Sequence, residues 1–301
     1  MSSGTQVQAN GIRIAVEDTG ADGSQAGRPV VLLIMGLGMQ LVAWPPVFVQ
    51  ALVDQGFRVV RFDNRDVGLS QHFDHLGVPN ILWESVKHRF GFAVRAPYTL
   101  PEMAADAIGV LDALGIAKAH VVGVSMGGMI AQRVALAAPD RTLSLCSIMS
   151  SSGARHLPGP QAHVMRAMLG RPKDMSEEMI LDHYVRLFKV IGSPGFPVDE
   201  AMLRERVLAG TRRSFHPEGT LRQMTAVAAD SSRADELARV KSPTLVVHGK
   251  SDPLVPFACG HDTARRIPGA KLVGIDGMGH DLAPGVVQRL LVSLVPHLKA
   301  A

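Results

Sequence analysis

Cysteine is scarce in this chain, and long apolar runs are missing altogether. The 301 residues include two cysteines, Cys146 and Cys259, which are too few for a disulfide framework. No stretch reaches the roughly 20 apolar residues that a transmembrane helix requires. Residues 1–10 also lack the basic start and apolar core of a signal peptide. We therefore expect a cytoplasmic protein without a membrane partner.

Runs of one charge are absent as well. The chain has 31 lysines and arginines against 27 aspartates and glutamates, and the two signs are interspersed. A nucleic-acid-binding surface concentrates basic residues on one face, so we expect no nucleic-acid partner. The hydrophobic content of 47% is that of a globular chain with a sizeable core. The sequence contains no internal repeat and leaves the oligomeric state open.

Apolar runs and amphipathic helical patterns alternate along most of the chain. This alternation favours an α/β fold, a doubly wound and mostly parallel sheet with crossover helices. The strands that it predicts are residues 11–17, 30–35, 57–62, 121–124, 143–149, 244–248 and 271–275. The helices that it predicts begin near residues 45, 100, 126, 257 and 284.

Residues 151–238 interrupt the alternation. Proline and glycine divide this stretch into short helical segments, and six methionines lie within it. We therefore divide the chain into a hydrolase-type core, residues 1–150 and 239–301, and a helical cap, residues 151–238. The methionines either form an adaptable apolar ligand surface or fill an ordinary core. Residues 71–98 follow no regular pattern and are interpreted as a loop excursion.

The chain is organised around the stretch from Ala119 to Ile130, where an apolar strand, a tight turn and a helix follow one another. The turn reads Gly123-Val124-Ser125-Met126-Gly127, a G-x-S-x-G pattern. The turn leaves no room for side chains at its two glycines. Its position between strand and helix predicts a nucleophile elbow, with the Ser125 hydroxyl exposed at the apex. The alternative is a turn whose serine merely caps the helix.

A serine hydroxyl becomes a nucleophile only when a base takes its proton and a third group orients that base. Loops that follow parallel strands meet at one edge of the sheet, so the partners should come directly after strands. Asp252 and His280 do so, and with Ser125 they follow the chain order Ser, Asp, His that is typical of this elbow. Asp230 and Asp281 are the fallback acids.

Attack by Ser125 on a carbonyl group creates a negative oxygen that backbone N–H groups must stabilise. The N–H of Met126, next to the nucleophile, is one predicted donor. The second is predicted to be Leu37, because Gly36 and Gly38 on either side let the backbone turn this N–H inward.

Together these motifs resemble the α/β-hydrolase superfamily. The chain is similar to capped, single-chain esterases of the aclacinomycin methylesterase-like type in its Trp-Pro after the oxyanion loop, its Asp63-Asn64-Arg65-Asp66-x-Gly-x-Ser stretch and its Gly-x-Gly-His280 ending. The resemblance implies hydrolysis of a small-molecule apolar ester through an acyl-enzyme, without a metal or cofactor. One departure is Met35, where many relatives carry histidine. We interpret the stretch at 63–70 as structural support.

The same triad serves other chemistry, because the pocket and not the triad selects the acceptor. The alternatives are a perhydrolase, a lactonase, a thioesterase, a C–C bond hydrolase and an acyltransferase. For an acyl-CoA-dependent transferase, basic residues at the site mouth are expected, and Arg155, Arg166, Arg171 and Lys173 lie early in the predicted cap. Outside the enzymes, the alternative is a small-ligand binding protein on a hydrolase fold.

Motifs for cofactor and metal chemistry are incomplete. A dinucleotide fingerprint that began at Gly36 would need a third glycine where Leu41 stands, and a phosphate loop that ended at Ser251 would need a glycine where Thr244 stands. His72 and His75 have the spacing of metal ligands without the further ligands of a known motif. We therefore expect no cofactor and no metal.

Overall fold

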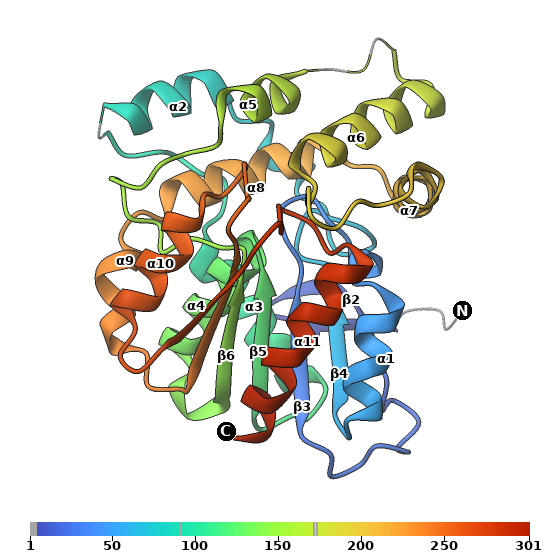
Figure 1. Ribbon diagram of the computed structural model, residues 1–301, viewed down its shortest axis with the longest axis vertical. Helices are drawn as coiled ribbons and strands as arrows, with labels where there is room; N and C mark the ends of the chain where they lie inside the picture. Colours follow the sequence, from blue (N-terminus) through green and yellow to red (C-terminus); the bar gives the residue numbers. More distant parts are fainter. Residues whose placement is uncertain (1–4, 91, 171, 173) are drawn as a thin grey trace.

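A computed structural model describes residues 5–90, 92–170, 172 and 174–301 of the chain. Its centre is an eight-stranded sheet with the strand order β1-β2-β4-β3-β5-β6-β7-β8 (Figure 1). The strands are β1 Thr5–Ala9, β2 Ile12–Asp18, β3 Val30–Ile34, β4 Arg58–Phe62, β5 Ala119–Val124, β6 Thr142–Ile148, β7 Thr244–Gly249 and β8 Lys271–Ile275.

The six strands from β4 to β8 across the sheet are parallel, and β1 and β2 pair antiparallel at one edge. β3 and β5 are buried along their whole length, which explains why both appear in the sequence as unbroken apolar runs. The predicted α/β class and parallel sheet are confirmed. β1 was not predicted, because this edge strand is largely exposed and its residues are mostly polar.

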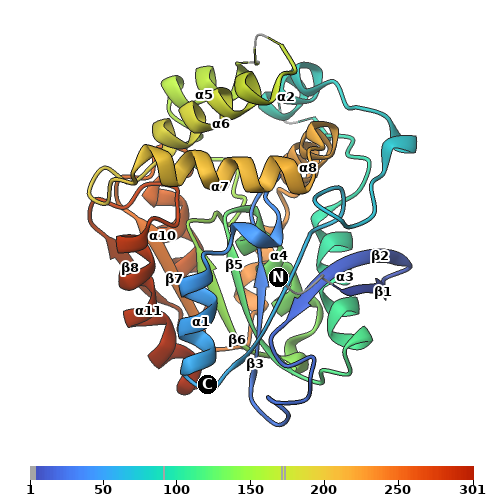
Figure 2. The same ribbon diagram turned by 90° about the vertical axis from the view of Figure 1, so that its right-hand side faces the viewer.

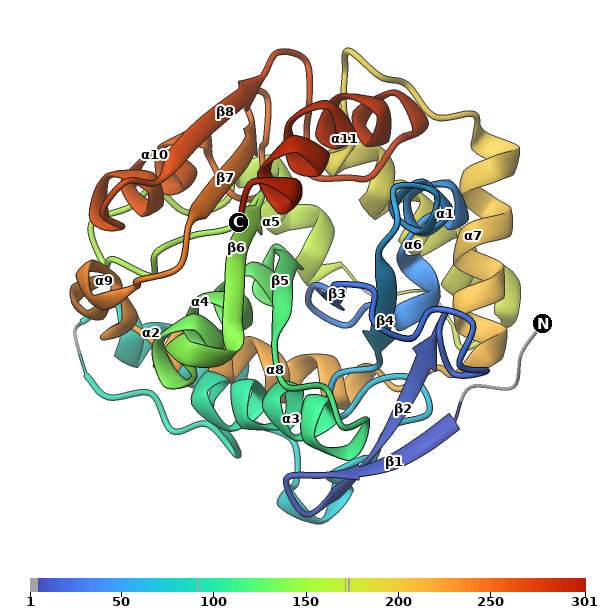
Figure 3. The ribbon, with the colours of Figure 1, turned by 90° about the horizontal axis from the view of Figure 1, so that it is seen from below.

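Helices cover both faces of the sheet (Figure 3). On one face, α1 and α11 pack around a core that includes Trp44, Phe48 and Leu290. On the other face, α3 and α4 pack around a second core that includes Leu32 and Ile130. The bounds of the helices in these layers are α1 Pro46–Asp54, α3 Leu100–Ala113, α4 Met126–Ala137, α9 Arg233–Glu236, α10 Phe257–Arg266 and α11 Pro284–Lys299.

A further group of helices lies beyond the carboxyl ends of the parallel strands (Figures 1 and 2). These are α2 Ile81–Arg89, α5 Ala162–Leu169, α6 Glu177–Ile191, α7 Glu200–Arg213 and α8 Pro217–Ala229. Leu181, Val185 and Val207 form a small apolar core between α6 and α7. Because a cap over this edge shields whatever binds there, the group fixes where a site can form.

The interpretation of residues 71–98 as a loop was wrong in part, because α2 lies within it and packs against α8. The division into a core and a cap of residues 151–238 stays a prediction. Within the described ranges, no helix is both long enough and apolar enough to cross a bilayer. The cytoplasmic location expected from the sequence also stays a prediction.

Candidate active site

The turn between β5 and α4 holds Ser125 at a φ of +55°, a backbone conformation that is costly for a residue with a side chain. Hydrogen bonds fix this conformation: the Ser125 N–H donates to Ile148 O at 2.9 Å, and the Ser150 hydroxyl donates to Ser125 O at 2.7 Å. A Cβ on Gly123 would lie 2.0 Å from Gly127 O. The glycine requirement predicted for this turn is therefore confirmed.

The structure brings together the three side chains predicted to act. His280 Nε2 lies 3.0 Å from Ser125 Oγ, and His280 Nδ1 lies 2.7 Å from Asp252 Oδ2. Asp252 and His280 are buried. In the tautomer with the proton on Nδ1, His280 donates to Asp252 and presents its free Nε2 lone pair to the Ser125 hydroxyl.

Asp252 is oriented by the backbone of its own loop. Its Oδ1 accepts hydrogen bonds from the N–H groups of Leu254 at 2.9 Å and Val255 at 2.8 Å, which leaves Oδ2 for His280. The fallback acids are engaged elsewhere: Asp230 pairs with Arg133 and Arg233, and Asp281 accepts hydrogen bonds from Ser193. Neither fallback acid is needed to complete the constellation.

His248, near the end of β7, is fully buried beside Asp252 and was missed by sequence analysis. Its Nε2 is 3.7 Å from Asp252 Oδ2 and makes a 2.7 Å hydrogen bond to Val255 O. Burial lowers the pKa of His248, although the Val255 carbonyl and Asp252 oppose this shift. A neutral His248 contributes no positive charge to compete with His280 for Asp252. In the sequence, the feature that could have pointed to His248 is its position four residues before Asp252.

The loop after β3 lies directly against the nucleophile. A Cβ on Gly36 would lie 3.2 Å from the Ser125 Cβ. The N–H groups of Leu37 and Met126 donate no hydrogen bond within the described part of the chain. Met126 is the first residue of α4, where helical N–H groups have no partner in the helix. Both groups are thus available to a ligand oxygen.

Polar side chains hold this loop, which begins with Met35 directly after β3. The Asn64 amide donates to Met35 O at 3.0 Å, and Asp63 Oδ1 accepts from the Leu41 N–H at 2.7 Å. Burial raises the pKa of Asp63, while Arg213 of α7, at 2.7 Å, opposes the rise. The loop is therefore anchored to the segment that follows β4, which Arg213 in turn ties to α7.

The stretch at 63–70 is a set of anchors, as the sequence predicted, but its ion pairs are not made among its own residues. Arg65 binds Asp106 of α3 through two hydrogen bonds of 2.6 and 2.7 Å. Asp66 binds Arg222 of α8 through two of 2.8 Å. Charge-assisted pairs of this bidentate kind are strong and geometrically specific. They connect the sheet edge to α3 on one side and to α8 on the other.

The loop that carries His280 is fastened to the end of α6. The His280 N–H donates to Ile191 O at 2.7 Å. The Ser193 hydroxyl donates to Asp281 Oδ1 at 2.5 Å and accepts from the Gly279 N–H at 2.8 Å. Ser193 was not predicted, and nothing in the local sequence indicates this contact across 88 residues.

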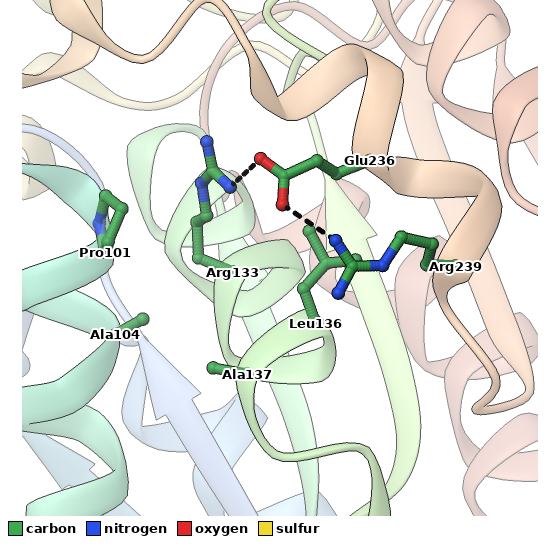
Figure 4. Close-up of a pocket in the computed structure, with 7 residues that line it drawn as sticks. All are labelled: Pro101, Ala104, Arg133, Leu136, Ala137, Glu236 and Arg239. Atoms are coloured by element: carbon green, nitrogen blue, oxygen red, sulfur yellow. Dashed lines mark hydrogen bonds and ion pairs between the residues drawn. The ribbon is translucent and has the colours of Figure 1, made fainter.

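A pocket of about 210 Å³ lies away from these residues, between α3, α4 and residues 236–239 (Figure 4). Its two arginines, Arg133 and Arg239, both bind Glu236, at 2.7 and 3.4 Å. The charges in this pocket are therefore already paired, and no catalytic group lines it.

His72, Asp74 and His216 lie close enough together for one metal ion. The two imidazole rings, however, stack with their centroids 3.9 Å apart and their planes within 2°. Because the lone pair of an imidazole lies in the ring plane, two parallel rings cannot direct their nitrogens at one ion. Arg222 Nη2, 3.0 Å from His216 Nε2, further disfavours a cation there.

Comparison with known proteins assigns the class. Residues 29–192 match the alpha/beta hydrolase fold family, and residues 222–288 match a family described as TAP-like protein. The chain belongs to the alpha/beta hydrolase fold family, and the resemblance predicted from its motifs is confirmed.

Among its relatives is the rhodomycin D methylesterase DnrP of Streptomyces peucetius, 33% identical over 93% of both chains. The putative carbamate hydrolase RutD of Pantoea ananatis is 28% identical over 86% of this chain and 84% of its own.

Solved structures agree with the fold. The meta-cleavage product hydrolase CumD from Pseudomonas fluorescens IP01 matches 99% of this chain and 98% of its own, with a TM-score of 0.74 and 20% identity. The enol-lactonase from Burkholderia xenovorans LB400 matches 98% of this chain and 100% of its own, with a TM-score of 0.69 and 22% identity. At these identities the likeness concerns the fold alone.

Proposed function

We propose that the protein hydrolyses small-to-medium carboxylic esters through an acyl-enzyme formed on Ser125, with His280 as the base and Asp252 as the group that orients it. The observation that carries the proposal is the position of one imidazole, 3.0 Å from a hydroxyl and 2.7 Å from a buried carboxylate. The relationship to methylesterases across nearly the whole chain supports ester cleavage as the reaction.

In the first half-reaction, Ser125 Oγ attacks the ester carbonyl carbon and its proton passes to His280 Nε2. Asp252 holds the opposite ring nitrogen and stabilises the imidazolium that forms. The N–H groups of Leu37 and Met126 donate to the oxygen that becomes negative. His280 then gives its proton to the departing alkoxide, which leaves as the alcohol, and the acyl group remains on Ser125.

In the second half-reaction, a water molecule takes the place of the alcohol. His280 removes a proton from this water as it attacks the acyl carbon, and the same two N–H groups stabilise the second oxyanion. His280 returns the proton to Ser125 Oγ, and the carboxylic acid leaves. The reaction needs no redox partner, and every proton is accounted for by His280.

The relatives suggest the alcohol part of the substrate. Because the similarity to rhodomycin D methylesterase extends over 93% of both chains, we propose that the natural substrate is an ester with a small leaving alcohol such as methanol. The acid part is an apolar small molecule that fits beneath the helices over the sheet edge. The acceptor in this scheme is water, in contrast to a perhydrolase or an acyltransferase.

The test is the substitution Ser125→Ala, with Ser293→Ala on the distant α11 as the matched control. The wild type and the control should hydrolyse p-nitrophenyl esters and gain the mass of one phosphonyl group from a fluorophosphonate. The Ser125 variant should do neither while it keeps its thermal unfolding midpoint. Near-wild-type turnover by this variant would reject the assignment, and slow labelling without turnover in the wild type would favour the binding-protein alternative.

A further inference from the structure

The outward face of α2 is apolar. Trp83, Val86 and Phe90 leave 60%, 45% and 72% of their surface exposed. They are spaced i, i+3 and i+7, so they share one side of the helix and its end. Phe92 and Val78 on either side of α2 are exposed as well. We call six exposed apolar residues at this end of the molecule the cap-top surface: Val78, Trp83, Val86, Phe90, Phe92 and Met165 of α5.

Two polar residues of α2 whose side chains the structure describes, Glu84 and Lys87, are largely covered. The side chains of Glu84 and Lys87 are only 12% and 18% exposed and form an ion pair of 2.6 Å. Glu84 also accepts a hydrogen bond from the Arg95 N–H at 3.0 Å. A helix on the surface of a protein in water normally places its apolar side inward and its charges outward. Among the described side chains of α2 the arrangement is reversed, since Trp83 and Val86 are more exposed than Glu84 and Lys87, and apolar areas of this kind mark contact surfaces.

No helix or strand of the described residues covers this face of α2. α2 packs against α8 beneath it, and both α2 and α5 lie at the end of the molecule farthest from the loops at the amino ends of the parallel strands (Figures 1 and 2). The cap-top surface therefore faces outward, and a partner can approach it without displacing another helix.

The charge of the two segments that form this surface identifies the partner. Residues 81–98 and 162–170 contain four lysines and arginines and one glutamate, a net charge of +3 in about a tenth of the chain. The whole chain has a net charge of +4, so the remainder is nearly balanced. Arg95 and Arg166 are exposed. Exposed aromatic residues among basic residues are typical of segments that lie on anionic lipid surfaces.

We propose that the cap-top surface binds peripherally to an anionic lipid surface, with Trp83 and Phe90 among the acyl chains near the headgroups and the exposed Arg95 and Arg166 at the lipid phosphates. A second copy of this chain fits less well, because a two-fold contact would bring two equally basic surfaces together. The expectation of no membrane partner rested on the lack of a spanning segment, which a surface contact does not require. The proposal is independent of the triad and goes beyond ester hydrolysis.

The chain carries its own reporter for this contact. It has two tryptophans, of which Trp44 is fully buried and Trp83 is exposed. The wild-type chain is mixed with vesicles of phosphatidylcholine alone, or of phosphatidylcholine with about one third phosphatidylglycerol. With the anionic vesicles, Trp83 emission should shift to the blue, brominated lipid should quench it, and the protein should cosediment. High salt and neutral vesicles should each weaken the partition about tenfold.

Two variants isolate the apolar contribution. The double substitution Phe90→Ser and Phe92→Ser keeps the Trp83 reporter and should weaken partition at least about tenfold. Val292→Ser, at an exposed valine on α11, is the matched control and should bind as the wild type does. Equal partition of the double variant and the wild type would overturn the proposal. It would also be overturned if the wild type failed to bind anionic vesicles, or if a lipid-free dimer protected Trp83 from quenching.

Discussion

Gln223 of α8 accepts a hydrogen bond from the Gly38 N–H at 2.8 Å and donates one to the Arg65 carbonyl at 2.8 Å. Its amide is fully buried, and it spans from a helix above the sheet edge to two loops of the sheet. The proposed oxyanion donor Leu37 precedes Gly38 directly. The conformation of this donor is therefore set in part by a residue 186 positions later in the chain.

Gln223→Leu should lower kcat at least about tenfold, with little change in KM. The substitution leaves the Gly38 N–H and the Arg65 carbonyl unpaired in a buried place, so the loop is expected to shift. A single oxyanion donor contributes about 3–4 kcal/mol to the barrier, and partial misplacement should cost about 1.4 kcal/mol or more. Affinity for a trifluoromethyl ketone, which forms the tetrahedral adduct, should fall in parallel.

Gln132→Leu is the control for a merely structural effect. Gln132 is also fully buried, and it donates to the Ser147 hydroxyl and accepts from Arg233. Its replacement should lower the free energy of unfolding to a similar degree but leave kcat largely intact. An equal loss of kcat in the two variants would contradict a positioning role for Gln223.

Ser193→Ala should lower kcat about tenfold, because the hydroxyl ties Gly279 and Asp281 on either side of His280 to the end of α6. Without it the imidazole is less well aligned with Ser125, while substrate binding is unaffected. Steady-state kinetics over a range of pH would check this. The effect should appear in kcat and in the shape of its pH profile, and KM should stay constant.

The same helix provides the control. Ser176 accepts a hydrogen bond from the Met179 N–H as the N-cap of α6, at the end opposite to Ser193. Ser176→Ala should cost about 1 kcal/mol of stability and leave the pH profile of kcat unchanged. If Ser176→Ala altered that profile as Ser193→Ala does, the contact at Ser193 would have no specific role.

The nucleophile, base and acid could be proposed from the sequence because each follows a strand of the parallel sheet. The strands before Ser125 and Asp252 are buried along their whole length and are recognisable as apolar runs, while β8 before His280 is a partly buried edge strand. The assignment of Ser125 as the nucleophile was further supported by Gly123 and Gly127, because a tight turn requires glycine at these positions. The oxyanion loop was located in the same way, at the end of β3. These inferences need only local pattern and the rule that strand ends share one edge.

The residues that hold these groups in place could not be found in that way. Gln223 and Ser193 act through contacts between segments that the sequence does not relate. His248 lies only four positions before Asp252, but it, like the other two, stands in no recognisable motif. α2 was missed for another reason. Its apolar residues do recur at helical spacing, but over nine residues only, which is too short for the pattern to stand out.

Asp252→Asn should reduce kcat by about 10³–10⁴ if the proposed triad operates, because an amide at this position favours the tautomer with the His280 proton on the wrong nitrogen. The two backbone N–H groups that bind Oδ1 should keep the side chain in place, so unfolding should change little. Asp276→Asn, at an exposed acid paired with Lys250, is the control and should retain full activity. A loss smaller than tenfold at position 252 would argue for a different acid.

His120 on β5 should make the protein less stable as the pH falls. Its buried ring forms a 2.9 Å hydrogen bond with the Ser144 hydroxyl and meets the Phe57 ring edge-on. Burial, and to a smaller extent His297, lowers the pKa of His120 from 6.5 to about 4. Below pH 6.5 the unfolded chain therefore binds a proton that the folded chain does not, until both are protonated below about pH 4.

The difference in proton binding between the unfolded and the folded chain sets the size of the stability change expected from His120. Between pH 7 and pH 5, His120 should reduce the free energy of unfolding by about 2 kcal/mol, at about 1.4 kcal/mol per pH unit below 6.5. Urea unfolding of the wild type and of His120→Asn at both pH values measures the effect. Burial also lowers the pKa of His248 and His297, but both remain in the variant and their contribution cancels to a first approximation. The wild type should therefore lose about 2 kcal/mol more than the variant, and an equal loss would mean that His120 is protonated in the folded chain.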